Sequence, residues 1–325
     1  MHAPCHDAPP IFQSIASGHG ASSASIRLTL WQNLTSFASY YEISSMRNVL
    51  LHRFAILVAI GLLALIADIA TVGPGTHLDQ PVVSIHLIAA AALGLLTFGL
   101  AAWMILMDSR PQARLLGWIA VGIGMLEGVV GLPPVRSMVP HTAGIAHAVL
   151  AQLFFSAVVA IAVVTSDAWS RGPELVFDYG WPSMRSLAIL SPILVVLQIS
   201  LGAAFRQKAL TLLPHVLGAM FVALVILLQS IFVLQQFPAH RALRMAAKTL
   251  LGVAFGQVFL GLTALIMKSM AEDTDLAVIV AVAAHVTGGA LTLATTLVLS
   301  ILIRRNVQPR IEEEDKDDLE APAAS

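Results

Sequence analysis

Long apolar runs separated by short polar stretches dominate the chain from about residue 50 to residue 305. Eight of these runs approach or exceed the ~20 residues that an α-helix needs to cross the hydrocarbon core of a bilayer. They lie at about 54–72, 82–106, 115–132, 143–166, 186–204, 213–235, 247–268 and 277–302. Backbone polar groups find no water in hydrocarbon, so each run must form a helix. The pattern predicts an all-α integral membrane protein with eight transmembrane helices.

Polar residues inside the apolar runs recur in a fixed arrangement. Glu127, Gln198 and Gln257 each stand four residues before a glycine near the end of a run. The next run then carries a histidine near its start: His147, His215 and His285, with His86 holding the same place in the first pair of runs. A recurring unit indicates an architecture built by duplication, here two pseudo-symmetric four-helix bundles.

This repeat divides the chain into five segments. We expect an N-terminal tail at 1–48, disordered or mis-annotated, because it lacks an apolar core. The other segments are an N-terminal bundle at 49–166, a linker at 167–185, a C-terminal bundle at 186–305 and an acidic tail at 306–325.

Composition supports the membrane interpretation and narrows the chemistry. The 325 residues are 57% hydrophobic and 11% charged, with a mean hydropathy of +0.83, which excludes an ordinary soluble domain. No basic stripe with interleaved aromatic residues appears, so nucleic acid is not expected as a partner. The single cysteine, Cys5, lies in the tail, which leaves the core without a disulfide, a thiolate metal site or an iron–sulfur cluster.

Lysine and arginine residues are unevenly distributed between the two ends of the predicted helices. One end carries most of them, including Arg110, and the other carries only Arg136, Arg206, Lys208 and Lys268. The positive-inside rule predicts that both termini are cytoplasmic, in a multi-pass protein of the bacterial cytoplasmic membrane.

The four histidines of the repeat form the strongest candidate site. Each lies roughly 20 residues before the end of its helix, which at ~1.5 Å per residue places all four at one depth. A lone intramembrane histidine has an alternative role, a hydrogen bond between helices. Four at one depth favour a functional site, and two histidines facing each other across a bundle suit bis-axial heme ligation. His141 competes with His147, but it lies six residues earlier, so we assign His147.

Several further polar residues bear on this site. We expect Arg136, Arg206 and Lys208 to neutralise heme propionates; the alternative is interfacial snorkelling. Glu127 is interpreted as a polar contact between helices, and Asp68 has no evident partner in the sequence. The remaining histidines near span ends or in loops, His52, His77 and His240, are expected to be solvated.

Three segments carry a family resemblance over about residues 50 to 305. They are His147-Ala-Val-Leu-Ala-Gln152-Leu-Phe154-Phe155 continuing to Thr165-Ser166 and Trp169; Gln198-Ile-Ser-Leu-Gly202-Ala-Ala-Phe-Arg206 followed by His215; and Gln257-x-x-x-Gly261 followed by His285. The chain thereby resembles the heme A synthase family, which acts in cytochrome oxidase assembly.

The resemblance implies two similar four-helix halves with different tasks. By position, His215 and His285 would ligate a resident heme B in the C-terminal half. His86 and His147 would bind heme O, the substrate whose methyl group the family oxidises to the formyl group of heme A. The implied partners are a membrane electron donor and heme O synthase or assembly proteins of cytochrome oxidase; homo-oligomers are compatible with it.

The chain departs from the family pattern near His86. Where family members carry a glutamate three residues before this histidine and an arginine after it, this chain has Val83 and Leu87. Asp79 is a weak candidate to replace that acid, because Pro81 stands between it and His86. Two hypotheses follow: a heme A synthase-like oxidoreductase, or a catalytically degenerate, cytochrome b-like protein for heme binding or electron transfer.

Overall fold

The computed structural model describes residues 48–68, 80–178, 181–272 and 275–309, with the backbone alone for 80–84. The described residues from Leu51 onward belong to one compact unit, and the account below concerns that unit. The N-terminal tail, the acidic tail after residue 309, His77 and the catalytic candidate Asp79 lie outside the described residues.

The described chain contains eight helices that are long and apolar enough to cross a membrane. They are Asn48–Asp68, α2 (Gln80–Met107), α3 (Pro111–Gly131), α5 (Pro140–Val164), α7 (Met184–Arg206), α8 (Leu212–Gln236), α9 (Arg241–Met270) and α10 (Leu276–Asn306). Short helices α4 (Pro133–Met138) and α6 (Asp167–Ser170) lie in the connections. The prediction of an all-α membrane protein with eight spanning helices is confirmed.

Helix starts and lengths follow from local sequence. Pro111, Pro133 and Pro140 each occupy the first turn of a helix, where a missing backbone N–H costs nothing. α9 has 30 residues and α10 has 31, so at ~1.5 Å per residue each exceeds the ~30 Å hydrocarbon core. Compared with the apolar runs predicted from sequence, α9 begins six residues earlier and α10 ends four residues later.

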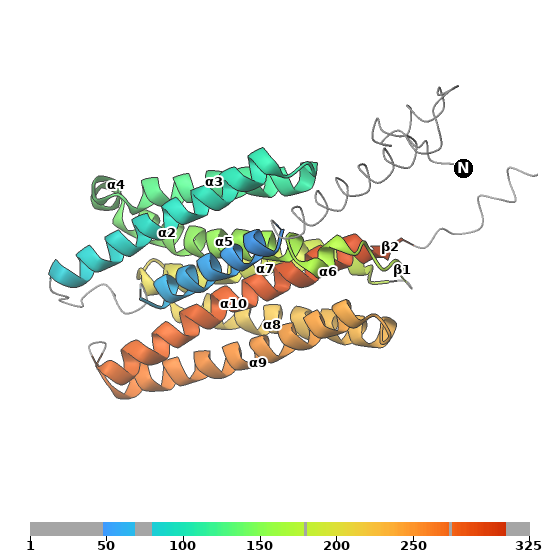
Figure 1. Ribbon diagram of the computed structural model, residues 1–325. Helices are drawn as coiled ribbons and strands as arrows, with labels where there is room; N and C mark the ends of the chain where they lie inside the picture. Colours follow the sequence, from blue (N-terminus) through green and yellow to red (C-terminus); the bar gives the residue numbers. More distant parts are fainter. Residues whose placement is uncertain (1–47, 69–79, 179–180, 273–274, 310–325) are drawn as a thin grey trace, which may run out of the picture. The chain divides into compact units, whose positions relative to one another are not determined.

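Helices α5, α7 and α10 run through the middle of the molecule (Figure 1), with α2 and α3 on one side and α8 and α9 on the other. α5 contacts both α7 and α10. Small buried residues on α10, among them Gly289 and Ala290, allow α10 and α5 to approach closely, as is common between membrane helices.

Two apolar clusters form the core. The first joins the helix Asn48–Asp68 to α2, α3 and α5, around Met104, Phe155 and Ile161, and it includes Ala290 and Ala294 of α10. The second joins α7, α8, α9 and α10 around Ile226, Leu250 and Leu299. Each half of the chain thus has a core of its own, and α10 contributes to both.

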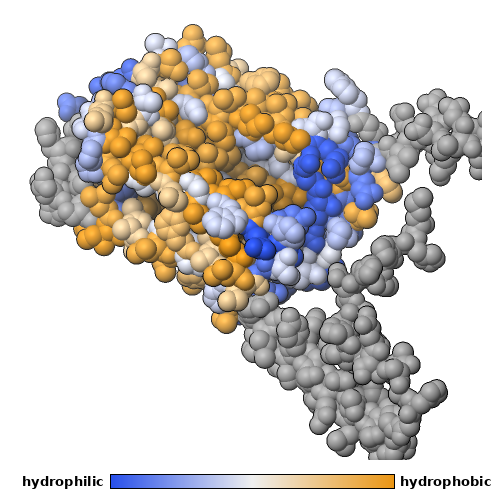
Figure 2. Space-filling view, turned by 90° about the horizontal axis from the view of Figure 1, so that it is seen from above, coloured by the Kyte–Doolittle hydropathy of each residue, from blue (hydrophilic) through white to orange (hydrophobic). Residues whose placement is uncertain are grey.

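Apolar side chains also cover much of the outer surface. In Figure 2 hydrophobic residues occupy most of the visible face, and hydrophilic residues gather chiefly toward the end where α6, β1 and β2 lie in Figure 1. Leu95, Met220 and Phe259 are examples of exposed apolar side chains, each more than 60% exposed. Such an extensive apolar exterior fits contact with lipid tails.

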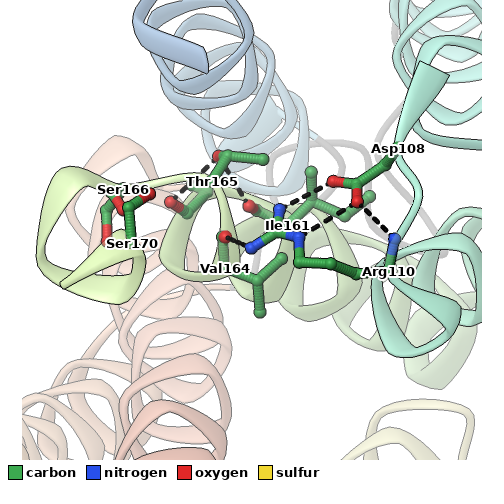
Figure 3. Close-up of polar contacts among 8 residues, drawn as sticks. Asp108, Arg110, Ile161, Val164, Thr165, Ser166 and Ser170 are labelled. Atoms are coloured by element: carbon green, nitrogen blue, oxygen red, sulfur yellow. Dashed lines mark hydrogen bonds and ion pairs between the residues drawn. The ribbon is translucent and has the colours of Figure 1, made fainter. Parts of the chain in front are cut away.

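We call the end with α6, β1 and β2 the linker end, and the opposite one the histidine end. At the linker end the turn between α2 and α3 holds the C-terminus of α5 (Figure 3). Arg110 donates to Asp108 at 2.6 and 3.0 Å and to the carbonyl oxygen of Val164 at 3.1 Å. These hydrogen bonds to Asp108 raise the pKa of Arg110 above its ordinary value, so the guanidinium stays charged while it caps α5.

The linker folds against the end of α10. Strand β1 (Val176–Phe177) pairs in parallel with β2 (Val307–Gln308), with Val176 opposite Val307. Arg305 lies 3.8 Å over the ring of Trp169 and donates to the Trp169 carbonyl at 2.6 Å. The described part of the predicted linker is therefore an ordered segment packed on the second half.

Two buried polar residues fix the helices that follow the linker. Asp178 accepts from the Met184 amide at 2.8 Å at the start of α7. His240 caps α9 by accepting from the Leu243 amide, and its Nε2 lies 3.1 Å from the Glu174 carbonyl oxygen. The prediction that His240 is solvated was wrong: it is 3% exposed, because it joins the linker to α9.

Candidate functional site

The candidate site of the second half is a pair of facing histidines. His215 lies in the first turn of α8, and His285 lies in the N-terminal third of α10. Their ring centroids are 6.2 Å apart and their planes cross at 84°. The two residues are 70 positions apart in the sequence, and the fold of the second half brings them together.

This separation matches what one metal ion between two imidazoles requires. A metal–imidazole bond is ~2 Å and a ring nitrogen lies about 1 Å from the ring centre, so two imidazoles on opposite sides of one iron have centroids roughly 6 Å apart. Porphyrin supplies the other four nitrogens of a heme, so the protein need provide only two ligands. No group of three or more His, Cys, Asp or Glu residues that would suit a bare metal ion occurs among the described residues.

The neighbouring helix α7 positions the His215 ring. The amide nitrogen of Gln198 lies 2.9 Å from His215 Nδ1 and donates to the His215 carbonyl at 2.8 Å. A Cβ built on Gly202 would lie 2.9 Å from Cε1 of the ring, closer than real side chains allow. Gly202 is therefore required for the His215 ring to approach α7. In this position Nδ1 is the ring nitrogen nearer to α7, and Nε2 is the farther one.

His285 repeats this arrangement on the next pair of helices. A Cβ on Gly261 of α9 would lie 2.8 Å from Cε1, 3.2 Å from Nδ1 and 3.6 Å from Nε2 of His285. The Gln257 side chain packs on Gly288, one turn after the histidine. In both pairs Nε2 is the ring nitrogen farthest from the supporting glycine, and it is the nitrogen that suits a metal.

The histidines of the first half contact carboxylates instead. His86 Nδ1 lies 2.9 Å from Asp68 Oδ2, and His147 Nδ1 lies 3.0 Å from Glu127 Oε1. His147 also packs over Gly131, where a Cβ would lie 3.4 Å from Cε1. The expected helix-to-helix contact of Glu127 is thus present, and its partner is the candidate ligand itself.

The sequence reasoning missed the partner of Asp68. No glycine stands four residues after Asp68, where the other three helices have one, so the repeat was not visible in the first pair. The structure supplies the missing member, because Asp68 ends its helix beside His86. In three helix pairs an Asp, Glu or Gln side chain of the earlier helix thus lies 2.9 to 3.0 Å from Nδ1 of the later histidine. In the last pair Gln257 packs on Gly288, one turn after His285.

The described residues do not bring all four histidines into one contact. Among the histidines that the structure describes, ring contact is found between His215 and His285 and not for His86 or His147. His141, the competitor of His147, lies at the exposed start of α5 with Nδ1 2.7 Å from the Gln207 carbonyl oxygen. It connects the two halves at the histidine end, and within the described ranges no carboxylate is paired with it as Glu127 is with His147.

The predicted propionate partners lie at the histidine end. Arg206 ends α7 and is half-buried, Lys208 follows it in an exposed turn with φ 58°, and Arg136 is exposed on α4. Arg206 and Lys208 thus precede His215 by one short loop. Their role toward a heme stays a prediction.

No protein-family model matches this chain, and no curated protein sequence is significantly similar to it.

Proposed function

We propose that this chain is a heme-binding membrane oxidoreductase of the heme A synthase type, converting heme O to heme A for cytochrome oxidase assembly. The observation that carries the proposal is the facing pair of His215 and His285, with centroids 6.2 Å apart. Gly202 of α7 and Gly261 of α9 each admit one ring closely, with Nδ1 nearer to the glycine than Nε2, and Gln198 also contacts Nδ1 of His215. That arrangement supports a resident heme B, which His215 and His285 would hold.

The second half would bind and orient this heme with its own residues. His215 and His285 would ligate through Nε2, and Gly202 and Gly261 provide the close approach that fixes their rings. Arg206 and Lys208 stand at the same end as His215, where anionic propionates would be neutralised by cations.

The first half would hold the substrate heme through His86 and His147. The heme, when bound, would supply the redox chemistry. The conversion of a methyl to a formyl group is a four-electron oxidation, so the proposal requires an oxidant of the class of dioxygen. It balances as two oxygen insertions, each taking two electrons from a membrane-borne donor and releasing one water, followed by loss of water from the geminal diol. The protein would contribute binding, orientation and exclusion of water by the apolar core around Phe155. Heme O synthase and assembly proteins of cytochrome oxidase are the corresponding partners, and a homo-oligomer is compatible with the proposal.

One observation favours the alternative, a catalytically degenerate cytochrome b-like protein. Val83 stands where the resembled family carries a glutamate before the second-helix histidine. Asp68 does not replace that acid, because it contacts Nδ1 of His86, the nitrogen opposite to the ligating one. The degenerate protein would retain heme at His215 and His285 but not oxidise heme O.

The proposed location is a bacterial cytoplasmic membrane with both termini cytoplasmic. The linker end carries Arg110, Arg171, Arg241 and Arg304, and the histidine end carries Arg136, Arg206, Lys208 and Lys268. The positive-inside rule then places the histidine end outside.

The test is expression in a host that makes heme O but no heme A, followed by an optical spectrum of the purified protein and chromatography of its extracted heme. Heme A, or its hydroxymethyl precursor, would establish the synthase. Heme B alone, with heme O unchanged, would establish the degenerate alternative. Absence of a Soret band from the purified protein would overturn both.

A further inference from the structure

The residues that accompany the four histidines differ in charge between the two halves. In the first half they are carboxylates: Asp68 at 2.9 Å from His86 Nδ1, and Glu127 at 3.0 Å from His147 Nδ1. In the second half the residues at the matching positions are uncharged amides: the amide nitrogen of Gln198 lies 2.9 Å from His215 Nδ1, and the Gln257 side chain packs on Gly288, one turn after His285. The repeat therefore keeps the position of the polar residue and changes its charge.

The two carboxylates differ in their packing. The side chains of His147 and Glu127 are each only 15% exposed, and within the described chain both His147 Nδ1 and Glu127 Oε2 are buried without a hydrogen bond, so the 3.0 Å between Nδ1 and Oε1 is an ion-pair distance. His86 is 16% exposed, whereas the Asp68 side chain beside it is 40% exposed. A buried carboxylate is costly unless it is paired, so the retention of Glu127 against His147 requires an explanation.

Carboxylate and amide have different effects on a metal-bound imidazole. A carboxylate that accepts the Nδ1 hydrogen strengthens the ring as an electron donor and adds a negative charge, and both effects stabilise the higher oxidation state of iron. An amide adds no charge and presents either its nitrogen or its oxygen to the ring. The same ligand type can thus produce two different reduction potentials.

We propose that Asp68 and Glu127 are positioning residues that strengthen His86 and His147 as electron donors, so that iron held by the first half has a lower reduction potential than iron held by the second. The inference rests on the proposed function, because it needs heme at both histidine pairs. It assigns the direction of electron flow: the second half, with the higher potential, retains an electron more readily than the first.

The experiment isolates each half within the full-length protein. His215→Ala with His285→Ala leaves the first pair as the sole heme ligands, and His86→Ala with His147→Ala leaves the second. Each protein is loaded with heme B, and its reduction potential is measured by equilibrium titration of the optical spectrum. We expect the first-half heme to have the lower potential.

Exchange of the accompanying residues then tests the cause. Asp68→Asn and Glu127→Gln, made in the first-half protein, should raise its potential. Gln198→Glu, made in the second-half protein, should lower it. Each change is expected to alter the relative affinity of the site for iron(III) and iron(II) heme at least tenfold. For a one-electron couple, a tenfold change is a shift of 59 mV in the reduction potential.

A matched control separates this local effect from net charge. Glu272 is exposed just after α9 at the histidine end, so Glu272→Gln removes the same charge without touching a histidine. In both proteins Glu272→Gln should change the relative affinity for iron(III) and iron(II) heme by no more than a few-fold.

The outcomes distinguish the inference from the function on which it rests. Heme in both proteins with equal potentials, or with potentials that the exchanges do not move, overturns the inference alone. Heme in the second-half protein only also overturns it, because no iron would then exist for Asp68 and Glu127 to tune. Heme in neither protein overturns the proposed function itself.

Discussion

The imidazole rings of His215 and His285 stand almost perpendicular, with planes at 84° and centroids 6.2 Å apart. Each ring is fixed by a different helix pair, His215 by Gly202 of α7 and His285 by Gly261 of α9. The packing of these four helices therefore brings the two rings together at this angle.

This angle predicts a spectroscopic signature. If both rings ligate one ferric heme while keeping their crossed planes, the low-spin iron should give a highly anisotropic electron paramagnetic resonance signal with one large g value. Parallel imidazoles give a rhombic signal instead. The measurement is a low-temperature spectrum of the oxidised second-half protein, and a rhombic signal would contradict retention of the crossed geometry.

Removal of either histidine should abolish the second-half heme. His215→Ala and His285→Ala each leave one axial ligand, so we expect loss of the low-spin spectrum at that site, partly restored by added imidazole. His141→Ala is the matched control, since His141 is an exposed histidine of the same end that contacts Gln207. A His285→Ala protein with an unchanged spectrum would show that the ligands were assigned wrongly.

The eight helices could be predicted from sequence because they depend on local apolar patterns. The apolar runs gave the spans, which the structure confirms to within a few residues for α5 and α8. The recurring Gln-x-x-x-Gly before a histidine reflects a real contact, because the glycine admits the histidine ring to the neighbouring helix. A sequence repeat was visible where it encodes such packing.

Contacts without a repeated local signal could not be predicted. Asp68 pairs with His86 across the first connection, and nothing in the sequence fixes how the end of one helix meets the next. His240 looked like a loop histidine, yet the linker folds over it through Glu174. The strand pairing of Val176 with Val307 depends on residues 131 positions apart. Each of these is set by tertiary structure.

The linker-end turn makes a prediction about stability. Asp108→Asn removes the charge from two hydrogen bonds to Arg110, which caps α5 through Val164. Because Arg110 is partly exposed, we expect a loss of only about 1 kcal/mol, seen as a lower unfolding temperature in detergent.

The pH dependence of this contribution has a definite sign. The folded protein raises the pKa of Arg110, so the stabilisation is fully present below the unfolded pKa and is lost only as pH rises through the folded one. Both lie in the strongly alkaline range. The contribution of Arg110 protonation should therefore be constant between about pH 6 and pH 9. A difference between wild type and Asp108→Asn that vanishes on raising the pH across this interval would contradict the assignment.

Two glycines of α9 offer the sharpest test of how the histidine is held. A Cβ on Gly261 would lie 2.8 Å from His285 Cε1, whereas a Cβ on Gly256, five residues earlier in the same helix, meets nothing within 4 Å. Gly261→Ala should therefore displace the His285 ring and reduce the heme content of the second half several-fold. Gly256→Ala should retain it and, since alanine favours helix more than glycine, keep or raise the unfolding temperature. Heme content per purified protein measures both. Equal heme content in the two variants would show that the close approach of His285 to α9 has no part in binding.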